Sequence, residues 1–126
     1  METNHWAFAL LIISLCTGSN SFGEQGRQRP EIIFHSPVHG AALTSSEVLV
    51  DVEVLGFPMN EVEGCAVIYL NTIPRHKACA PRFQHILGGV RDGLSVVDVA
   101  LVDGSDYELP HGWASASFSV GPPPPP

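Results

Sequence analysis

The feature that most constrains this chain is an apolar side chain at every second position of several short segments. In residues 48–55 (VLVDVEVL) every even position is a valine, and Asp51 and Glu53 fall on the opposite parity. Successive side chains of a β-strand point to opposite faces, so this pattern predicts a half-buried strand. A helix would need apolar residues three and four positions apart. The body of the chain is therefore expected to be β-sheet.

Further strand candidates follow at short intervals. They are residues 32–34, 65–70, 83–87, 97–101 and 114–120. Residues 65–70 (CAVIYL) are apolar at both parities, as expected of a central strand that is covered on both faces. Clusters of Gly, Pro, Asn and Asp separate the candidates and supply the backbone conformations that turns require. Six to seven short strands in about 90 residues predict an all-β, two-sheet antiparallel sandwich over residues 31–120.

Segments of different character flank this body. Residues 6–15 are an apolar run that contains one polar residue, Ser14, and small and polar residues follow it. This order predicts a signal peptide over residues 1–23, with an uncleaved anchor or a buried helix as alternatives, since no Lys or Arg precedes the run. The run is shorter than the about 20 residues that cross a bilayer. Residues 24–30 are polar and predict a flexible lead-in.

The other end of the chain is a proline tract. Gly121 is followed by five prolines, and consecutive prolines adopt an extended polyproline II conformation. We expect residues 121–126 to be a linker or a tail. If they are a linker, the chain is a fragment of a larger multidomain protein; if not, the tract is a natural Pro-rich tail or a docking motif.

Charge excludes two classes of partner. The 126 residues carry a formal net charge of −7. An acidic chain repels phosphate backbones and anionic lipid headgroups, so we expect no nucleic-acid partner and no polybasic attachment to membranes. No second segment is long and apolar enough to span a bilayer, so no membrane span is expected after signal cleavage.

Two cysteines, Cys65 and Cys79, remain once Cys16 leaves with the predicted signal peptide. In an oxidising compartment they would form a disulfide that closes a loop of about 15 residues, which stabilises a fold by about 3 kcal/mol. The alternative is two buried free thiols. The predicted location is secreted, at the cell surface or in the secretory pathway.

The order of these pieces resembles immunoglobulin-like modules of secreted and cell-surface proteins. Ser36-Pro37 with Gly40 resembles the entrance of such modules, and Asp92-Gly93 followed by alternating Val and Leu resembles their penultimate strand. Cys65 and Cys79 are too close in sequence for the inter-sheet bridge of antibody domains. The chain is therefore more similar to the bacterial-type and fibronectin III-like modules that precede or separate catalytic domains in exported enzymes.

This resemblance implies a non-catalytic module that spaces, presents or adheres, with a protein or carbohydrate ligand. The alternatives are a carbohydrate-binding module and an accessory domain of a secreted carbohydrate-active enzyme whose catalytic domain lies outside this sequence. Sugar rings stack on aromatic side chains, so Trp113 and Tyr107, which flank the final hairpin, are the candidate ligand-binding residues. We expect a monomer without a cofactor.

The candidate metal-binding and catalytic side chains can be interpreted as structural or surface residues. Pro37 lies between His35 and His39 and prevents a helical metal-binding face, so no metal site is expected there. Asp51 and Glu53, about 7 Å apart along a strand, could serve an inverting glycosidase, but we interpret them as a solvated face. No Ser lies in a G-x-S-x-G sequence.

An acidic cluster near the last hairpin is the remaining candidate. Asp103, Asp106 and Glu108 could share a calcium ion with loop carbonyls, but their spacing matches no EF-hand loop. An Asp-Gly hairpin corner explains them equally well. We therefore predict neither metal nor catalytic residues.

Overall fold

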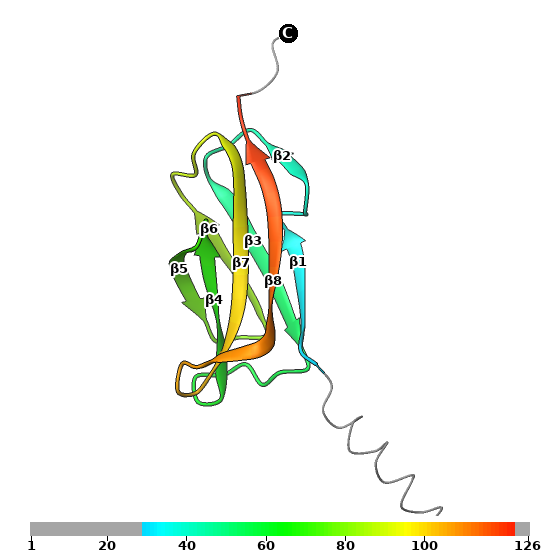
Figure 1. The fold of residues 1–126 in the computed structure, drawn as a ribbon, viewed down its shortest axis with the longest axis vertical. Helices are drawn as coiled ribbons and strands as arrows, with labels where there is room; N and C mark the ends of the chain where they lie inside the picture. The colour runs from blue at the N-terminus through cyan, green and yellow to red at the C-terminus, as the bar shows by residue number, and fades with distance from the viewer. Residues whose placement is uncertain (1–28, 123–126) are drawn as a thin grey trace, which may run out of the picture.

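The computed structural model describes residues 29–122. The predicted signal peptide and most of the proline tract lie outside the described residues. Within them the chain forms eight strands (Figure 1): β1 (Glu31–Ser36), β2 (Ala41–Leu43), β3 (Val48–Leu55), β4 (Gly64–Leu70), β5 (Ile73–Ala78), β6 (Arg82–Leu87), β7 (Gly93–Asp103) and β8 (Glu108–Val120).

The strands build two sheets that pack face to face. One has the order β1-β3-β6 and the other the order β2-β8-β7-β4-β5. Strand pairs are antiparallel except for β2 with β8, which is parallel. The predicted all-β, two-sheet sandwich is confirmed. No helix in the described part of the chain is long and apolar enough to cross a bilayer.

The core lies where the alternation predicted it. The four valines at the even positions of β3 are at most 2% exposed. The side chains that pack in the same core from the five-stranded sheet include Ile68, Val97, Val99, Leu101 and Phe118. Full burial of an aliphatic or aromatic side chain contributes about 1.5–3 kcal/mol, so these inner faces hold the two layers together.

The structure has two strands more than the lower expectation of six, because β2 and β5 were not predicted. Pro74 lies inside β5, and five of its six residues are exposed. Proline cannot donate to a ladder hydrogen bond and is tolerated at a sheet edge. β5 is such an edge, because it pairs with β4 alone. Because neither face of this exposed edge strand is buried, its sequence does not alternate between apolar and polar residues.

A two-residue turn joins β4 to β5 and explains the position of that edge. Asn71 and Thr72 have φ values of 49° and 73°, which are typical of the type I′ turns that connect tight hairpins. The Asn71 side chain accepts a hydrogen bond of 2.9 Å from the Val96 amide and lies 3.3 Å from the Ser95 hydroxyl. The turn is thus anchored to β7.

The final strand contains a large bulge at residues 109–112. Ala100 of β7 pairs with Trp113, yet Val102 pairs with Glu108. Four residues of β8 therefore lie opposite one residue of β7. Leu109, inside the bulge, packs against the core. Bulges re-aim the side chains that flank them, and this one places Glu108 beside Trp113.

The interpretation of Asp51 as a solvated carboxylate is wrong. Asp51 is 7% exposed on the outer face of the three-stranded sheet. Arg82 donates two hydrogen bonds to its carboxylate, of 2.8 and 3.0 Å, and Gln84 donates a third of 3.0 Å. These bonds, the Arg82 pair above all, outweigh burial and lower the pKa of Asp51 to about 2. Glu53 is half-buried and binds His35 at 3.0 Å.

The cysteine pairing is as predicted. Cys65 of β4 is bonded to Cys79, which directly follows β5. The disulfide therefore links neighbouring strands of one sheet instead of joining the two sheets. It fastens the edge strand β5, whose exposed side chains contribute little burial of their own.

Candidate functional site: an aromatic hollow on the five-stranded sheet

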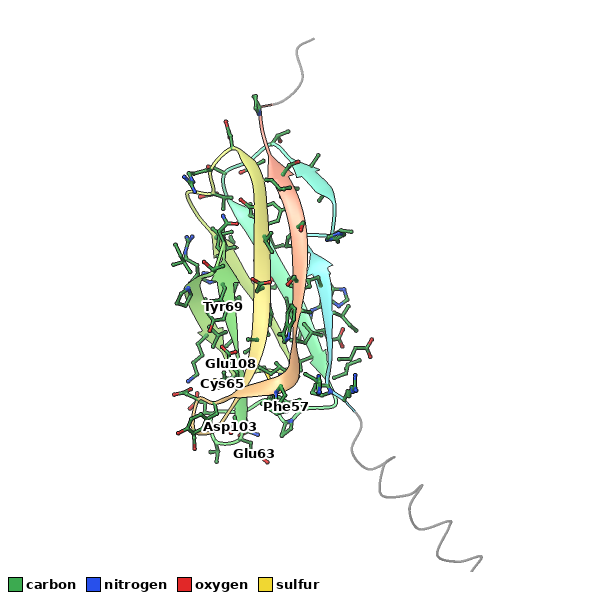
Figure 2. The ribbon with its side chains drawn as sticks, in the orientation of Figure 1. Phe57, Glu63, Cys65, Tyr69, Asp103 and Glu108 are labelled. Atoms are coloured by element: carbon green, nitrogen blue, oxygen red, sulfur yellow. A yellow bond between two sulfur atoms is a disulfide. The ribbon has the colours of Figure 1, made fainter. Side chains whose placement is uncertain are left out.

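The outer face of the five-stranded sheet is where aromatic and acidic side chains meet. Pairing of β4, β7 and β8 sets the rows across this face: Val67, Ala100 and Trp113 form one, and Tyr69, Asp98 and Ser115 form the next. Figure 2 shows Tyr69 and Cys65 of β4 near Glu108, the first residue of β8. Below them lie Asp103, at the end of β7, and Glu63, in the connection before β4. The face combines apolar and polar groups, so it is suited to contact a ligand.

One shallow hollow collects these groups. Its volume is about 360 Å³, and it is lined by Tyr69, Thr72, Asp98, Ala100, Glu108 and Trp113. Trp113 is 62% exposed. Ala100, directly opposite Trp113, has a small side chain that leaves the indole without a bulky neighbour in its own row. The hollow therefore offers an accessible aromatic surface beside two carboxylates.

Hydroxyl groups orient both carboxylates. The Tyr69 hydroxyl donates a hydrogen bond of 3.1 Å to Glu108 Oε2, and the Ser115 hydroxyl donates to Asp98 Oδ1. Burial and the neighbouring Glu108 raise the pKa of Tyr69, so its hydroxyl remains a donor. No Lys or Arg is among the lining residues. At neutral pH the hollow carries two negative charges and no cation of its own.

A second hollow of about 430 Å³ adjoins the first along β5. Tyr69 and Glu108 line both hollows, and the second also contains Arg75 and Lys77. Lys77 forms an ion pair of 2.7 Å with Asp106. Charge on this face is therefore graded, from acidic beside Trp113 to mixed beside β5.

The structure separates the two predicted ligand-binding residues. Trp113 lines the first hollow, whereas Tyr107 lies in the connection between β7 and β8, is 72% exposed and is not among the lining residues. Tyr69 takes the place beside Trp113. Sequence reasoning missed Tyr69 because residues 65–70 were interpreted as covered on both faces. Tyr69 lies two residues after Val67, and alternate residues of a strand point to the same face. This spacing could have placed Tyr69 on the outer face of β4. Binding by Trp113 and Tyr107 stays a prediction.

The other candidate groups have separate structural partners. His39 accepts a hydrogen bond of 3.1 Å from the Ser117 amide, while His35 pairs with Glu53. Asp103 accepts from the Ser105 and Tyr107 amides, a cap of the hairpin connection. Asp106 binds Lys77 and Glu108 binds Tyr69, so the three acidic side chains do not converge. Among residues 29–122 no group of three potential ligands could hold a metal ion.

Two histidines meet at the open edge between the sheets. The rings of His76 (β5) and His85 (β6) stack with centroids 4.0 Å apart and planes inclined by 6°. Burial lowers the pKa of His85, and the nearby positive charges of His76 and Arg75 lower it further. The stack joins β5 to β6 as an aromatic contact.

Comparison with solved structures places this fold. The fibronectin(III)-like modules of Clostridium thermocellum CbhA match with a TM-score of 0.56 and 10% identity, over 71% of this chain and 96% of that chain. An engineered protein matches with a TM-score of 0.53 and 13% identity, over 75% of this chain and 21% of its own. No protein-family model matches the sequence, and no curated protein matches it. The fold is that of a fibronectin III-like, immunoglobulin-like sandwich.

Proposed function

We propose that this chain is a non-catalytic module of an exported protein, which spaces or presents neighbouring segments or adheres to a partner. The main observation behind the proposal is that the candidate catalytic side chains form structural hydrogen bonds and ion pairs. The buried Asp51 binds Arg82 and Gln84, and His35 and His39 bind Glu53 and the Ser117 amide. Side chains committed to structural contacts on separate elements are a poor basis for acid–base catalysis, which needs convergent groups in a cleft.

The positions of the two chain ends support a spacing role. The chain enters the sandwich at one end through β1 and leaves from the opposite end through β8 (Figure 1). A module whose termini lie at opposite ends separates the segments before and after it by its own length. Polyproline segments act as semi-rigid spacers in the same way, and Gly121 and Pro122 start such a segment.

The disulfide supports export. Disulfides persist in oxidising compartments and are rare in the reducing cytosol. The Cys65–Cys79 bond agrees in this respect with the signal peptide predicted over residues 1–23. We therefore propose a secreted or cell-surface location.

A carbohydrate-binding role is the second candidate, and the exposed indole of Trp113 favours it. It ranks second because Tyr107, the other predicted contact, does not line the hollow that contains Trp113. An accessory role beside a catalytic domain outside this sequence is a finer version of the first proposal. The CbhA modules share the fold at 10% identity, which supports the architecture alone.

Expression of the full chain in a secretory host with a C-terminal tag tests the proposal. We expect the tagged protein in the medium, with a new N-terminus near Glu24 and with Cys65 and Cys79 protected from alkylation until a reductant is added. A matched variant, Cys65→Ser with Cys79→Ser, should show no reductant-dependent alkylation. Retention inside the cell with both thiols reactive would contradict the proposal.

A further inference from the structure

We propose that the hollow beside Trp113 binds a basic peptide segment, with one arginine or lysine side chain lying between the indole and the carboxylates of Asp98 and Glu108. This binding goes beyond the proposed spacing role, which does not depend on it. The proposal combines the charge of the hollow, its hydrogen-bonding groups and its aromatic surface.

Charge is the first argument. Two of the six lining residues are acidic and none is basic. Glu108 is exposed and Asp98 is half-buried. The hydrogen bonds they accept come from neutral hydroxyls, which orient the carboxylates but leave their charge uncompensated. A cation entering the hollow would be attracted by both carboxylates.

The balance of donors and acceptors distinguishes a cation from a sugar. Each carboxylate has two oxygens, and the structure commits one of each to a hydroxyl donor. The remaining oxygens accept only, and the Tyr69 hydroxyl already donates to Glu108. A guanidinium offers five N–H donors and no acceptor, so it matches this lining. A sugar hydroxyl is both donor and acceptor and would find few donors here.

The aromatic ring supplies the third contact. A guanidinium or ammonium group over the face of a tryptophan is attracted by the ring quadrupole. Trp113 is 62% exposed, and its neighbour in the row is the small Ala100. The hydrophobic stem of an arginine or lysine would lie along the ring while its charge reaches the carboxylates.

The bulge in β8 explains why these groups are adjacent. A regular ladder continuing from the Ala100–Trp113 pair would place His111 opposite Val102, but Glu108 occupies that place. Gly112 is buried in the bulge, and a Cβ there would lie 3.0 Å from Leu109 Cβ and 3.1 Å from Leu101 Cβ. The bulge is thus closely packed against the core, which holds Glu108 and Trp113 in a fixed relation.

The adjoining hollow limits the kind of peptide that fits. Lys77 and Arg75 on β5 would repel a second cation placed on that side. We therefore expect a single basic residue with neutral or acidic neighbours to bind better than a run of basic residues. This preference separates the site from non-specific attraction to an acidic protein.

An NMR titration of the uniformly labelled full chain tests the proposal. The probes are acetyl-Gly-Arg-Gly-amide, the neutral acetyl-Gly-Gln-Gly-amide and a neutral glucose hexasaccharide. We expect the arginine probe to shift the Trp113 indole N–H and the Tyr69 and Ala100 amides, with a dissociation constant on the order of 1 mM at low salt. The glutamine probe and the sugar should shift them little at equal concentration.

Variants locate the binding. We expect Trp113→Ala to weaken binding about tenfold, as measured by the shift of the Tyr69 amide. The double variant Asp98→Asn with Glu108→Gln should weaken binding about tenfold as well. Glu108→Gln alone should also weaken binding. Its charge-matched control is Glu47→Gln, because Glu47 is exposed in the connection before β3, and this control should leave binding unchanged. A retained fingerprint spectrum shows that each variant is folded.

Three outcomes would overturn the proposal. The first is no saturable shift with the arginine probe below 20 mM, taken as roughly twentyfold the expected dissociation constant. The second is equal weakening by Glu47→Gln. The third is tighter binding of the hexasaccharide with loss in Trp113→Ala, which would assign the hollow to a sugar. None of these outcomes alters the result of the export experiment.

Discussion

Loss of the Cys65–Cys79 bond should destabilise the fold by about 3–4 kcal/mol. The two cysteines are 14 positions apart, so the bond closes a loop of about 15 residues in the unfolded chain. The entropy of that closure amounts to about 3 kcal/mol at 25 °C. Cys65 is 5% exposed, and replacing its sulfur by hydrogen leaves a small cavity that adds up to about 1 kcal/mol.

The assay is urea unfolding of the full chain, with Cys16→Ala in both the parent and the variant to prevent disulfide exchange. The variant Cys65→Ala with Cys79→Ala should have a lower midpoint and a larger m-value, because its unfolded state is more expanded. A folded unit of about 90 residues loses roughly 4–8 °C in Tm per kcal/mol, so a loss of about 3–4 kcal/mol should lower the melting point by about 12–32 °C.

A loss below about 1 kcal/mol with an unchanged m-value would refute the reasoning. It would mean that the β4–β5 hairpin already keeps its ends together in the unfolded ensemble, so that the bond removes little entropy. Reduction of the parent with dithiothreitol provides an independent comparison, since it breaks the bond without changing any side chain to alanine.

Three further substitutions test local features of the fold. Asn71→Ala should cost about 2 kcal/mol in urea unfolding, because alanine is strained at a φ of 49° and the bond to the Val96 amide is lost; Asn71→Gly relieves the strain, so a loss no smaller than that of alanine would contradict this account. Gly112→Ala should cost about 1–3 kcal/mol by overpacking, whereas Gly88→Ala, with nothing within 4 Å of the new Cβ, should change stability little; equal effects would argue against the packed bulge. Asp51 has a folded pKa of about 2 against the ordinary aspartate value of 3.8, so its ionised form stabilises the fold above pH 3.8 and this contribution is lost as the pH falls through about 2. Asp51→Asn should therefore flatten acid unfolding curves between pH 4 and 2, and curves parallel to the parent's would exclude this contribution.

Much of the fold could be predicted because burial imposes a period on the sequence. β3 is half-buried, and its valines occur at every second position. The same rule located β7 and the second half of β8. It fails at β5, which is exposed at a sheet edge, and at β2, whose three residues are too few to show a period. A proline inside β5 then indicated a break where the structure has a strand.

The site was harder to predict because it depends on register. Trp113 was identified by its residue type, but its neighbours Tyr69 and Glu108 belong to other positions of the sheet. Only the bulge in β8 brings Glu108 beside Trp113, and the sequence Pro110-His111-Gly112 indicates a turn equally well. The burial of Asp51 could not be predicted for the same reason. Its carboxylate lies on the polar face of β3, but it is covered by Arg82, which is 31 residues away in the sequence.

Cross-strand nuclear Overhauser effects between β7 and β8 of the full chain test the central claim most directly. The claim is that the β8 bulge assembles Glu108, Trp113 and Tyr69 on one face of the five-stranded sheet. The structure predicts backbone contacts of Ala100 with Trp113 and of Val102 with Glu108. A contact of Val102 with His111 in place of Glu108 would show a regular ladder without the bulge, and both the hollow and its proposed ligand would be wrong.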